Sequence, residues 1–287
     1  MTPRRLRFLV ALLDEQHRGG PSGIRPMSGA ERHAVGLHMA EKELRAQLEA
    51  FQAENREVNI FLRADDVGKD ERGLRQLFDV ALSRGVSLNV EIIPGILTDS
   101  TVKLLQSYQH FCPTLLELNQ HGWQHCSHEI SGRKSEFGVS RSFKQQLEDI
   151  EMGKKVLERV FHDKFHPVFA PPWNRCTGDT LRVLDRLGFR VLSRHKSEAG
   201  ATGYSFREIP VTLDLYRWKG GVTMAPKEEI LRDLVCQMRD GYTIGVLLHH
   251  QVMDPGAFSF LAGLLDELTQ YPVVRFHTFL SLVGPIT

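Results

Sequence analysis

Two histidines four residues apart, His121 and His125, are the clearest candidates for chemistry in this sequence. They come after a short apolar run at residues 115–118, and two imidazoles at this spacing can bind one metal ion. A zinc protease would carry a glutamate directly after its first histidine, on a helix, whereas Gly122 follows here and favours a tight loop. A catalytic zinc usually takes three protein ligands and leaves one position open. The pair therefore requires a third ligand, a base and an acid from elsewhere in the chain.

The composition is that of a folded globular protein with balanced charge. The 287 residues are 41% hydrophobic and 25% charged, which supplies enough apolar side chains for a full core. Lysine plus arginine (36) nearly balance aspartate plus glutamate (35), so nothing indicates nucleic-acid binding. The four cysteines are scattered and form no Cys-x-x-Cys pair, which favours reduced thiols and a cytoplasmic location.

The N-terminus imitates a signal peptide without completing one. A basic start is followed by an apolar run at residues 8–13, but six residues make a short hydrophobic region, and Asp14 and Glu15 stand in place of a small-residue cleavage site. No stretch approaches the roughly 20 apolar residues of a membrane-spanning helix. We therefore expect a soluble protein without a transmembrane segment.

After a breaker-rich linker at residues 19–26, residues 30–55 have the apolar spacing of a long amphipathic helix. Short strands and helices then alternate to the end of the chain, which predicts parallel βαβ crossovers. About seven such units suit a closed or nearly closed barrel better than an open sheet. Strands are expected at residues 58–63, 86–93, 115–118, 168–170, 189–192, 209–215, 243–248 and 273–276, and helices at 72–84, 98–111, 143–161, 177–187, 227–239 and 258–268.

The candidate catalytic and metal-binding residues all lie just after predicted strands. In an α/β barrel the active site gathers at the carboxyl ends of the strands, so these residues are expected to meet. They are the Asp65-Asp66 pair after the first strand, His121 and His125 after the third, Pro171 to Asn174 after the fourth, and His249-His250 after a late one.

The adjacent carboxylates Asp65 and Asp66 allow two interpretations. At a buried strand end they repel each other and need a cation or a proton between them. A turn that caps the next helix would also use Asp-Asp-Val-Gly, and spacing alone gives this interpretation about half the weight. With a metal nearby, one aspartate would complete an Asp-His-His ligand set, and the other would face the open position as a base.

Four motifs in order resemble the polysaccharide deacetylases, carbohydrate esterase family four. They are Ala64-Asp65-Asp66, His121-x-x-x-His125, Pro171-Pro172 and Leu247-Leu248-His249, and the resemblance covers roughly residues 58 to 280. It implies an α/β fold, a distorted (β/α)7 barrel, with a divalent metal, most commonly Zn2+, and hydrolysis of N- or O-acetyl groups on sugars. We expect a helical N-terminal extension at residues 1–55 and the barrel at residues 56–287.

The resemblance also implies roles for individual residues. By position, Asp65 resembles the catalytic base and His249 the acid that protonates the leaving amine, while Asp66, His121 and His125 resemble the metal ligands. The candidates for substrate contact are Arg63, Pro172, Trp173, Asn174, Trp218 and His250.

The sequence departs from the family pattern at several of these positions. The arginine that usually precedes Pro-Pro and tethers the base is replaced by Ala170. Arg63 lies two residues before Asp65, on the same side of a strand, and we hypothesise that it substitutes. His250 follows His249, so the choice of acid between them stays open. Asp214 and Trp218 match more loosely a family segment that supports the acid histidine and lines the pocket.

The remaining histidines and cysteines have ordinary interpretations. His128 is interpreted as a surface residue, and His162, His166 and His195 as structural or solvated, because no partner is evident in the sequence. Cys126 beside the site is interpreted as a buried thiol and not as a soft ligand.

These observations predict a metal-dependent hydrolase that removes an acetyl group from a sugar, glycan or glycolipid. The missing pre-proline arginine keeps open a C–N hydrolase of the same fold that acts on a small non-sugar amide. A barrel that binds glycan without turnover is the other alternative. It is disfavoured because a pure binder needs neither the base at Asp65 nor the acid at His249.

Overall fold

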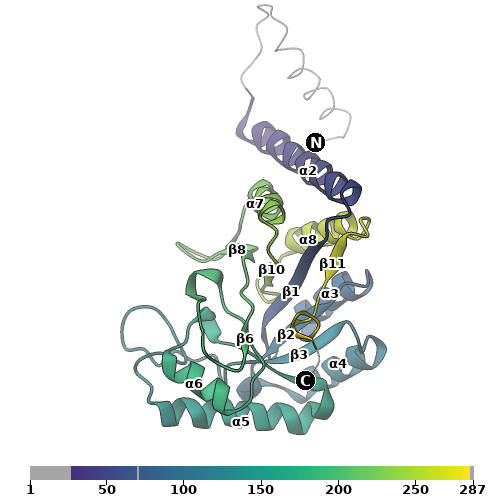
Figure 1. Ribbon diagram of the computed structural model, residues 1–287. Coiled ribbons are helices and arrows are strands. Elements are labelled where there is room, and N and C mark those ends of the chain that lie inside the picture. Colours follow the sequence, from purple (N-terminus) through teal and green to yellow (C-terminus); the bar gives the residue numbers. More distant parts are fainter. Residues whose placement is uncertain (1–26, 70, 285–287) are drawn as a thin grey trace, which may run out of the picture.

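A parallel sheet curls into a barrel with helices around its outside in the computed structural model, which describes residues 27–69 and 71–284 (Figure 1). The predicted apolar run at residues 8–13 and the linker at residues 19–26 lie outside these residues. All strand pairs of the large sheet are parallel. Its strands are β1 (Val58–Val67), β2 (Leu88–Ile92), β3 (Leu116–His121), β4 (Phe165–Ala170), β5 (Val191–Leu192), β6 (Arg207–Glu208), β7 (Leu213–Asp214), β10 (Ile244–Leu248) and β11 (Val274–Phe276).

The alternation of strands and helices predicted from the sequence is confirmed. The helices are α2 (Gly29–Ala53), α3 (Glu71–Leu82), α4 (Asp99–Phe111), α5 (Phe143–Phe161), α6 (Gly178–Arg186), α7 (Lys227–Asp240), α8 (Pro255–Leu268) and α9 (Phe279–Val283). β1 and β3 are longer than predicted, so Asp65, Asp66 and His121 lie within strands and not after them. The predicted strands ended too early because the prediction relied on apolar residues, whereas these strand ends carry polar side chains.

The barrel closes through one continuous segment that the sheet order divides into β6 and β7. At its start this segment pairs with β5, at Arg207 and Glu208. At its end it pairs with β10, at Leu213 and Asp214. Between them, the amide of Val211 donates to the carbonyl of Arg194 at 3.0 Å. Counting this segment once gives seven strands around the barrel, which confirms the distorted (β/α)7 architecture.

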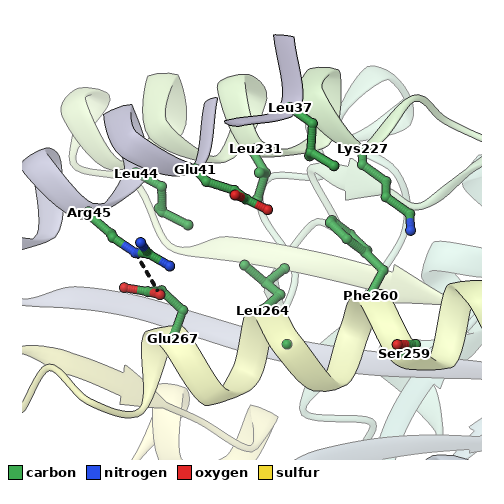
Figure 2. A pocket seen from close by; sticks show the side chains of 11 residues that line it. Leu37, Glu41, Leu44, Arg45, Lys227, Leu231, Ser259, Phe260, Leu264 and Glu267 are labelled. Atoms are coloured by element: carbon green, nitrogen blue, oxygen red, sulfur yellow. Dashed lines mark hydrogen bonds and ion pairs between the residues drawn. The ribbon is translucent and has the colours of Figure 1, made fainter. Parts of the chain in front are cut away.

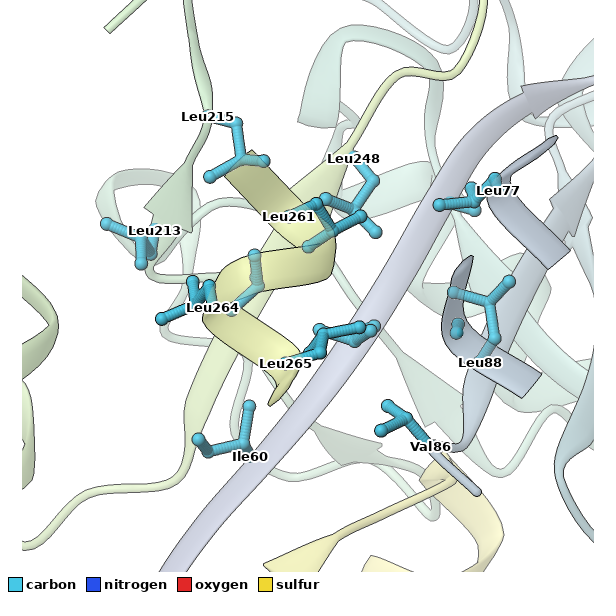
Figure 3. Packing of buried hydrophobic residues seen from close by; sticks show 14 of the residues in the cluster. Ile60, Leu77, Val86, Leu88, Leu213, Leu215, Leu248, Leu261, Leu264 and Leu265 are labelled. Carbon is cyan, nitrogen blue, oxygen red and sulfur yellow. The ribbon is translucent and has the colours of Figure 1, made fainter. Parts of the chain in front are cut away.

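Most of the core lies between the sheet and the outer helices (Figure 3). Side chains such as Ile60, Leu88 and Leu248 point outward from the strands, against Leu77 of α3 and Leu261 of α8. Burial of these apolar surfaces is the main driving force for folding. A separate, smaller apolar cluster fills part of the barrel interior and contains Phe61, Val168, Val191, Val211, Leu247 and Phe279.

Tight packing inside the barrel explains one glycine of β10. A Cβ atom at Gly245 would lie 2.3 Å from the ring of Phe61 and 2.8 Å from the carbonyl oxygen of Pro210. Phe61 contacts Phe279 of α9 with ring centroids 4.9 Å apart. Gly245 therefore lets the closing segment approach β10 and β1 closely.

The N-terminal helix α2 packs on α7 and α8 (Figure 1). Its buried face consists of Ala40, Leu44, Leu48 and Phe51, which belong to the same apolar cluster as the barrel strands. Figure 2 shows a groove along this contact, where Arg45 of α2 pairs with Glu267 of α8 at 2.9 Å. A capping box at Ser28 and Glu31 starts the helix. The helix is thus joined to the barrel by shared core, while a domain boundary near residue 55 remains a proposal.

The barrel interior is polar where β1, β2 and β3 face it. Inward positions alternate with the outward apolar ones, as the two-residue period of a strand requires. At the amino ends of the strands, the backbone N–H groups of Phe279 and Leu280 donate to Asn89 Oδ1 (2.8 Å) and Glu117 Oε2 (3.0 Å). These bonds hold the C-terminal α9 across the barrel end. The buried polar residues of this face are Arg63, Asp65, Asn89, Glu91, Glu117, Asn119 and His121.

Two carboxyl groups of this polar face are held near their protonated form. Burial raises the pKa of Glu91 to about 8, although the positive charge of Arg63 opposes the shift. Burial raises the pKa of Glu117 to about 7, against the N–H bond from Leu280. Asn119 Nδ2 donates to Glu91 Oε1 at 3.0 Å.

None of the described helices is both long enough and apolar enough to cross a membrane.

The packing of α2 predicts that Leu48→Ala destabilises the barrel itself. Leu48 is fully buried, so the cavity and the lost apolar contact are expected to lower the free energy of unfolding by about 2–5 kcal/mol. Urea unfolding followed by tryptophan fluorescence measures this, because Trp123, Trp173 and Trp218 all lie outside α2. The exposed Gln52→Ala is the control, with a change within about 0.5 kcal/mol. An unchanged barrel transition in Leu48→Ala would show that α2 unfolds independently.

The raised pKa of Glu117 predicts a pH-dependent gain in stability for Glu117→Gln. Because the folded pKa lies above the ordinary value, the native state loses stability as pH rises from about 4.5 through 7. The amide does not ionise, so its free energy of unfolding relative to wild type is expected to rise by about 1–3 kcal/mol between pH 5 and pH 8. Urea unfolding at both pH values is the measurement, with the exposed Glu49→Gln as control. A difference independent of pH would contradict the assignment.

Candidate metal centre

Asp66, His121 and His125 bring three potential metal ligands together at the carboxyl ends of β1 and β3. One ligand atom from each side chain lies within 4.8 Å of the other two. The Nε2 atoms of His121 and His125 are 3.3 Å and 3.1 Å from Asp66 Oδ1. Two imidazole nitrogens and one carboxylate oxygen form a common protein ligand set for a catalytic zinc ion. The predicted third ligand and histidine pair thus meet in space.

The ring of His121 is oriented by the neighbouring strand β4. Its Nδ1 lies 2.9 Å from the carbonyl oxygen of Ala170, the residue paired with His121 across the sheet. A carbonyl can only accept, so Nδ1 donates its proton to Ala170, and Nε2 is the nitrogen that faces Asp66 and would bind a metal. Burial lowers the pKa of His121, but the charges of Asp65 and Asp66 outweigh it and raise the pKa to about 9.

Gly122 allows the chain to turn directly after His121. Its φ is +61°, and a Cβ atom there would lie 2.2 Å from Glu136 Oε2 and 2.6 Å from Pro172 Cγ. The carboxylate of Glu136 accepts bonds from the backbone N–H groups of Trp123 (3.2 Å) and Gln124 (2.7 Å). The loop that carries His125 is therefore held by a buried acid, and only glycine fits at its start.

Strained backbone marks this part of the molecule. Six non-glycine residues of the described chain have positive φ, and four of them are Asp66, His125, Trp173 and Asn174. Such conformations cost free energy and persist where surrounding contacts fix them. At Asp66 the contact comes from Gln251, whose Nε2 donates to the Asp66 carbonyl at 2.7 Å.

Asp65 is buried beside the ligand set and is held by Arg63. Arg63 donates from Nε to Asp65 Oδ1 (2.8 Å) and from Nη2 to Oδ2 (2.7 Å), a bidentate pair. Burial opposes ionisation of Asp65, yet the charges of Arg63, His121 and His249 together outweigh it and keep the pKa of this carboxyl below its usual range. The arginine expected from the sequence to substitute for the missing one at position 170 does reach Asp65.

The Pro-Pro-Trp-Asn segment completes the surroundings of Arg63. A 3-10 turn at Pro172–Asn174 places both Trp173 (φ +54°) and Asn174 (φ +59°) in the left-handed region. Asn174 Oδ1 then accepts from Arg63 Nη2 at 2.7 Å, while the Trp173 ring lies 4.3 Å from that of His125. Ser193, after β5, accepts from Arg63 Nη1 through its carbonyl (2.9 Å) and its Oγ (3.0 Å).

Another acid–histidine group lies on the side of the barrel formed by β7 and β10. His249 Nδ1 is 4.0 Å from Asp214 Oδ1. Asp214 also accepts from Trp218 Nε1 (2.9 Å), and the Trp218 ring packs edge-on against His249 at 4.6 Å. Burial raises the pKa of Asp214, although His249 opposes this. Trp218 belongs to a hairpin of β8 (Tyr216–Arg217) and β9 (Thr223–Met224) that the sequence pattern did not predict.

A cavity of about 430 Å3 joins these groups. The predicted site residues that line it are Asp65, Asp66, His121, His125, Trp173, Asn174, Trp218 and His249. Arg63, Pro172 and His250 are not among its lining residues, and His250 is only 1% exposed. The two tryptophans are accessible here and not buried in the core, since Trp218 is 47% exposed.

The structure also adds residues that the sequence did not single out. His195, interpreted from the sequence as structural or solvated, lines the cavity, as do Arg133, Arg175 and Glu198. The only signal for His195 was its position just after β5. Ser197 N–H and Oγ both contact His195 Nδ1, at 3.2 Å and 2.8 Å. Cys126 is exposed, which corrects its interpretation as a buried thiol.

Comparison with solved structures identifies the same architecture elsewhere. A Mycobacterium smegmatis protein provisionally described as a polysaccharide deacetylase matches with a TM-score of 0.58 and 19% identity, over 74% of this chain and 75% of that one. A family 4 acetyl xylan esterase from Clostridium thermocellum, in complex with a cobalt ion, has a TM-score of 0.52 and 15% identity, over 78% and 90% of the two chains.

A third structure, the Bc1960 peptidoglycan N-acetylglucosamine deacetylase, has a TM-score of 0.50 and 14% identity over 79% of this chain and 88% of that one. No protein-family model and no curated protein sequence matches the chain. At these identities the likeness establishes architecture. The chain has the fold of the polysaccharide deacetylases and family 4 carbohydrate esterases.

Proposed function

We propose that the chain belongs to the polysaccharide deacetylase family and removes an acetyl group from a sugar, glycan or glycolipid with the help of a divalent metal, Zn2+. The observation that carries the proposal is the content of one cavity. It holds an Asp-His-His ligand set, a buried carboxylate beside it and a histidine on another wall. Hydrolysis of an amide needs these groups: a Lewis acid, a base and an acid.

The residues present fit a zinc ion. Asp66, His121 and His125 supply one oxygen and two nitrogens, and the bond from His121 Nδ1 to Ala170 leaves Nε2 as the ligand atom of His121. Three protein ligands leave room for substrate and water. When bound, the ion would polarise the acyl carbonyl and favour ionisation of water.

Asp65 is proposed as the general base. The charges of Arg63, His121 and His249 keep the carboxylate ionised although it is 2% exposed, and the pairing with Arg63 fixes its orientation. An ionised carboxylate can take a proton from the attacking water. The same pairing would explain how this chain functions without an arginine before Pro171.

His249 is proposed as the acid that protonates the leaving nitrogen. It lines the cavity, whereas His250 is buried outside the lining, so the geometry favours His249 of the two. Asp214 Oδ1 lies 4.0 Å from its Nδ1, and the Trp218 ring packs edge-on against it. An exposed indole ring at this position also suits stacking on a sugar.

A small non-sugar amide remains the second candidate substrate for the same chemistry, since Asp65 is tethered from a different position than in the family pattern. Burying Asp65 as an ion costs free energy, and a non-catalytic glycan-binding barrel would gain nothing from such a residue. This alternative is therefore disfavoured. We also propose a reducing compartment such as the cytoplasm, in keeping with the four free cysteines.

The proposed roles predict that two substitutions have opposite effects on metal binding. Asp65→Asn is expected to retain bound zinc but to lose about a hundred- to ten-thousand-fold in turnover, because the base is removed. His121→Ala is expected to lose the metal. Metal content by atomic emission and acetate release from N-acetylated amino sugars are the measurements. A metal-free wild type, or full turnover in Asp65→Asn, would refute the mechanism.

The bidentate pair predicts that Arg63→Lys retains metal and lowers kcat about a hundred-fold. One ammonium group cannot bind both Asp65 oxygens while also reaching Asn174 and Ser193, so the base loses its fixed position. Arg84→Lys is the matched control, because Arg84 forms a bidentate pair with Asp266 at the surface (2.7 and 2.9 Å). Equal kcat values for the two variants would contradict the role of Arg63.

A further inference from the structure

Arg175 lines the cavity, and none of the described carboxylates lies within ion-pair distance of its guanidinium group. We infer that Arg175 forms an anion-binding subsite, so that the natural substrate carries a carboxylate or phosphate close to its acylated group. The inference rests on the proposed function for the bond that is hydrolysed. What it adds is a charge requirement for the substrate, drawn from residues outside the metal centre.

The other charged groups of the cavity wall each have a polar partner within the protein. Asp66 contacts His121 and His125, and Asp214 accepts from Trp218 Nε1 at 2.9 Å. Asp65 pairs with the buried Arg63 at 2.7 Å. Glu198 pairs with Arg133 at 2.7 Å. Among the described side chains, no carboxylate lies within ion-pair distance of the Arg175 guanidinium, although Arg175 lines the same cavity. Unlike Arg133, Arg175 thus has no carboxylate partner among the described residues.

The hydrogen bonds of Arg175 are also incomplete. Its side chain donates once, from Nη1 to the carbonyl oxygen of Lys134 at 2.9 Å. Its Nε is buried without a partner in the described structure. Arg194 is a useful contrast, because its Nε donates to Glu208 at 2.5 Å and its Nη1 contacts Cys176 at 3.6 Å. The buried Nε cannot meet a ligand, but the remaining Nη donors of a planar guanidinium can bind carboxylate or phosphate oxygens.

The electrostatic surroundings point the same way. Burial lowers the pKa of Arg175, the neighbouring charge of Arg133 lowers it further, and Glu198 offsets this only in part. For Arg194, burial also lowers the pKa, but Glu208, Cys176 and Glu198 together outweigh it, and the pKa is raised. A desolvated cation next to another cation is destabilised, and a bound anion would relieve both effects.

Arg175 is positioned by the same turn that serves the proposed catalytic groups. It directly follows Trp173, which contacts His125, and Asn174, which binds Arg63. Its backbone N–H donates to the Pro172 carbonyl at 3.3 Å, which closes the 3-10 turn. The cavity of about 430 Å3 falls within the range of about 300–1,000 Å3 typical of small-molecule sites. The metal centre and Arg175 therefore line one cavity of the size that holds a small molecule.

Binding of matched neutral and charged sugars to the zinc-loaded protein tests the subsite without requiring turnover. The probes are N-acetylglucosamine, N-acetylmuramic acid with its carboxylate, and N-acetylglucosamine 6-phosphate. By calorimetry, the wild type should bind at least one charged probe about ten- to hundred-fold more tightly than the neutral one, as a charge-assisted bond implies. The two charged probes distinguish a carboxylate site from a phosphate site.

Two variants assign the preference to Arg175. Arg175→Gln should lose it and bind all three sugars with the wild-type affinity for the neutral one. Arg175→Lys should regain part of it. Lys134→Gln is the matched control: it removes a nearby exposed positive charge that does not line the cavity, and should keep the preference. Thermal unfolding checks that each variant is folded.

The outcomes separate this inference from the proposed function. Equal binding of the three probes by wild type, or a preference that survives in Arg175→Gln, overturns the anion subsite. If the charge preference depends on Arg175 but no acetylated sugar releases acetate, the subsite stands and the proposed hydrolysis fails. If acetate is released equally from charged and neutral sugars, the hydrolysis stands and the subsite fails.

Discussion

The structure at the carboxyl end of the barrel depends on the buried ion pair of Arg63 and Asp65. Removing two charges from water is costly, and the cost is offset only when the remaining donors are satisfied. All of the guanidinium N–H groups have acceptors, in Asp65 itself, in Ser193 after β5 and in Asn174. Strands far apart in the sequence are thereby fixed to one another at the carboxyl end of the barrel.

Satisfying that arginine has consequences along the Pro-Pro-Trp-Asn turn. Asn174 can reach Arg63 only because it and Trp173 both adopt left-handed backbone conformations. The same turn sets the Trp173 ring against His125 and directs the next residue, Arg175, into the cavity wall. The need to satisfy the hydrogen bonds of Arg63 on β1 therefore affects the geometry of both the proposed metal centre and the proposed anion subsite.

Much of the fold and part of the site could be predicted from the sequence. Alternating apolar segments gave the order of strands and helices, because each must bury an outward apolar face. The same pattern predicted that Asp65, Asp66, His121, His125 and His249 lie close together. They follow predicted strands, and the carboxyl ends of parallel strands lie at the same end of a barrel. The closing segment from Arg207 to Asp214 was not recognised as shared between β5 and β10, because its pairing partners lie at different distances along the chain. His195 and Arg175 were missed because a single polar residue after a short strand carries no periodic signal.

The sequence by itself determined the residue types and their spacing: a histidine pair, two adjacent carboxylates and a proline turn without its usual arginine. Those are local properties, and they suffice to predict a parallel barrel with a metal-binding rim. Only the tertiary structure decided which side chains are paired and which are left without a partner. It brought Ser193 and Asn174 to Arg63, placed His249 but not His250 in the cavity lining, and left Arg175 without a carboxylate partner among the described residues. The physical reason is that pairing and desolvation depend on contacts between residues more than a hundred positions apart, which no local pattern records.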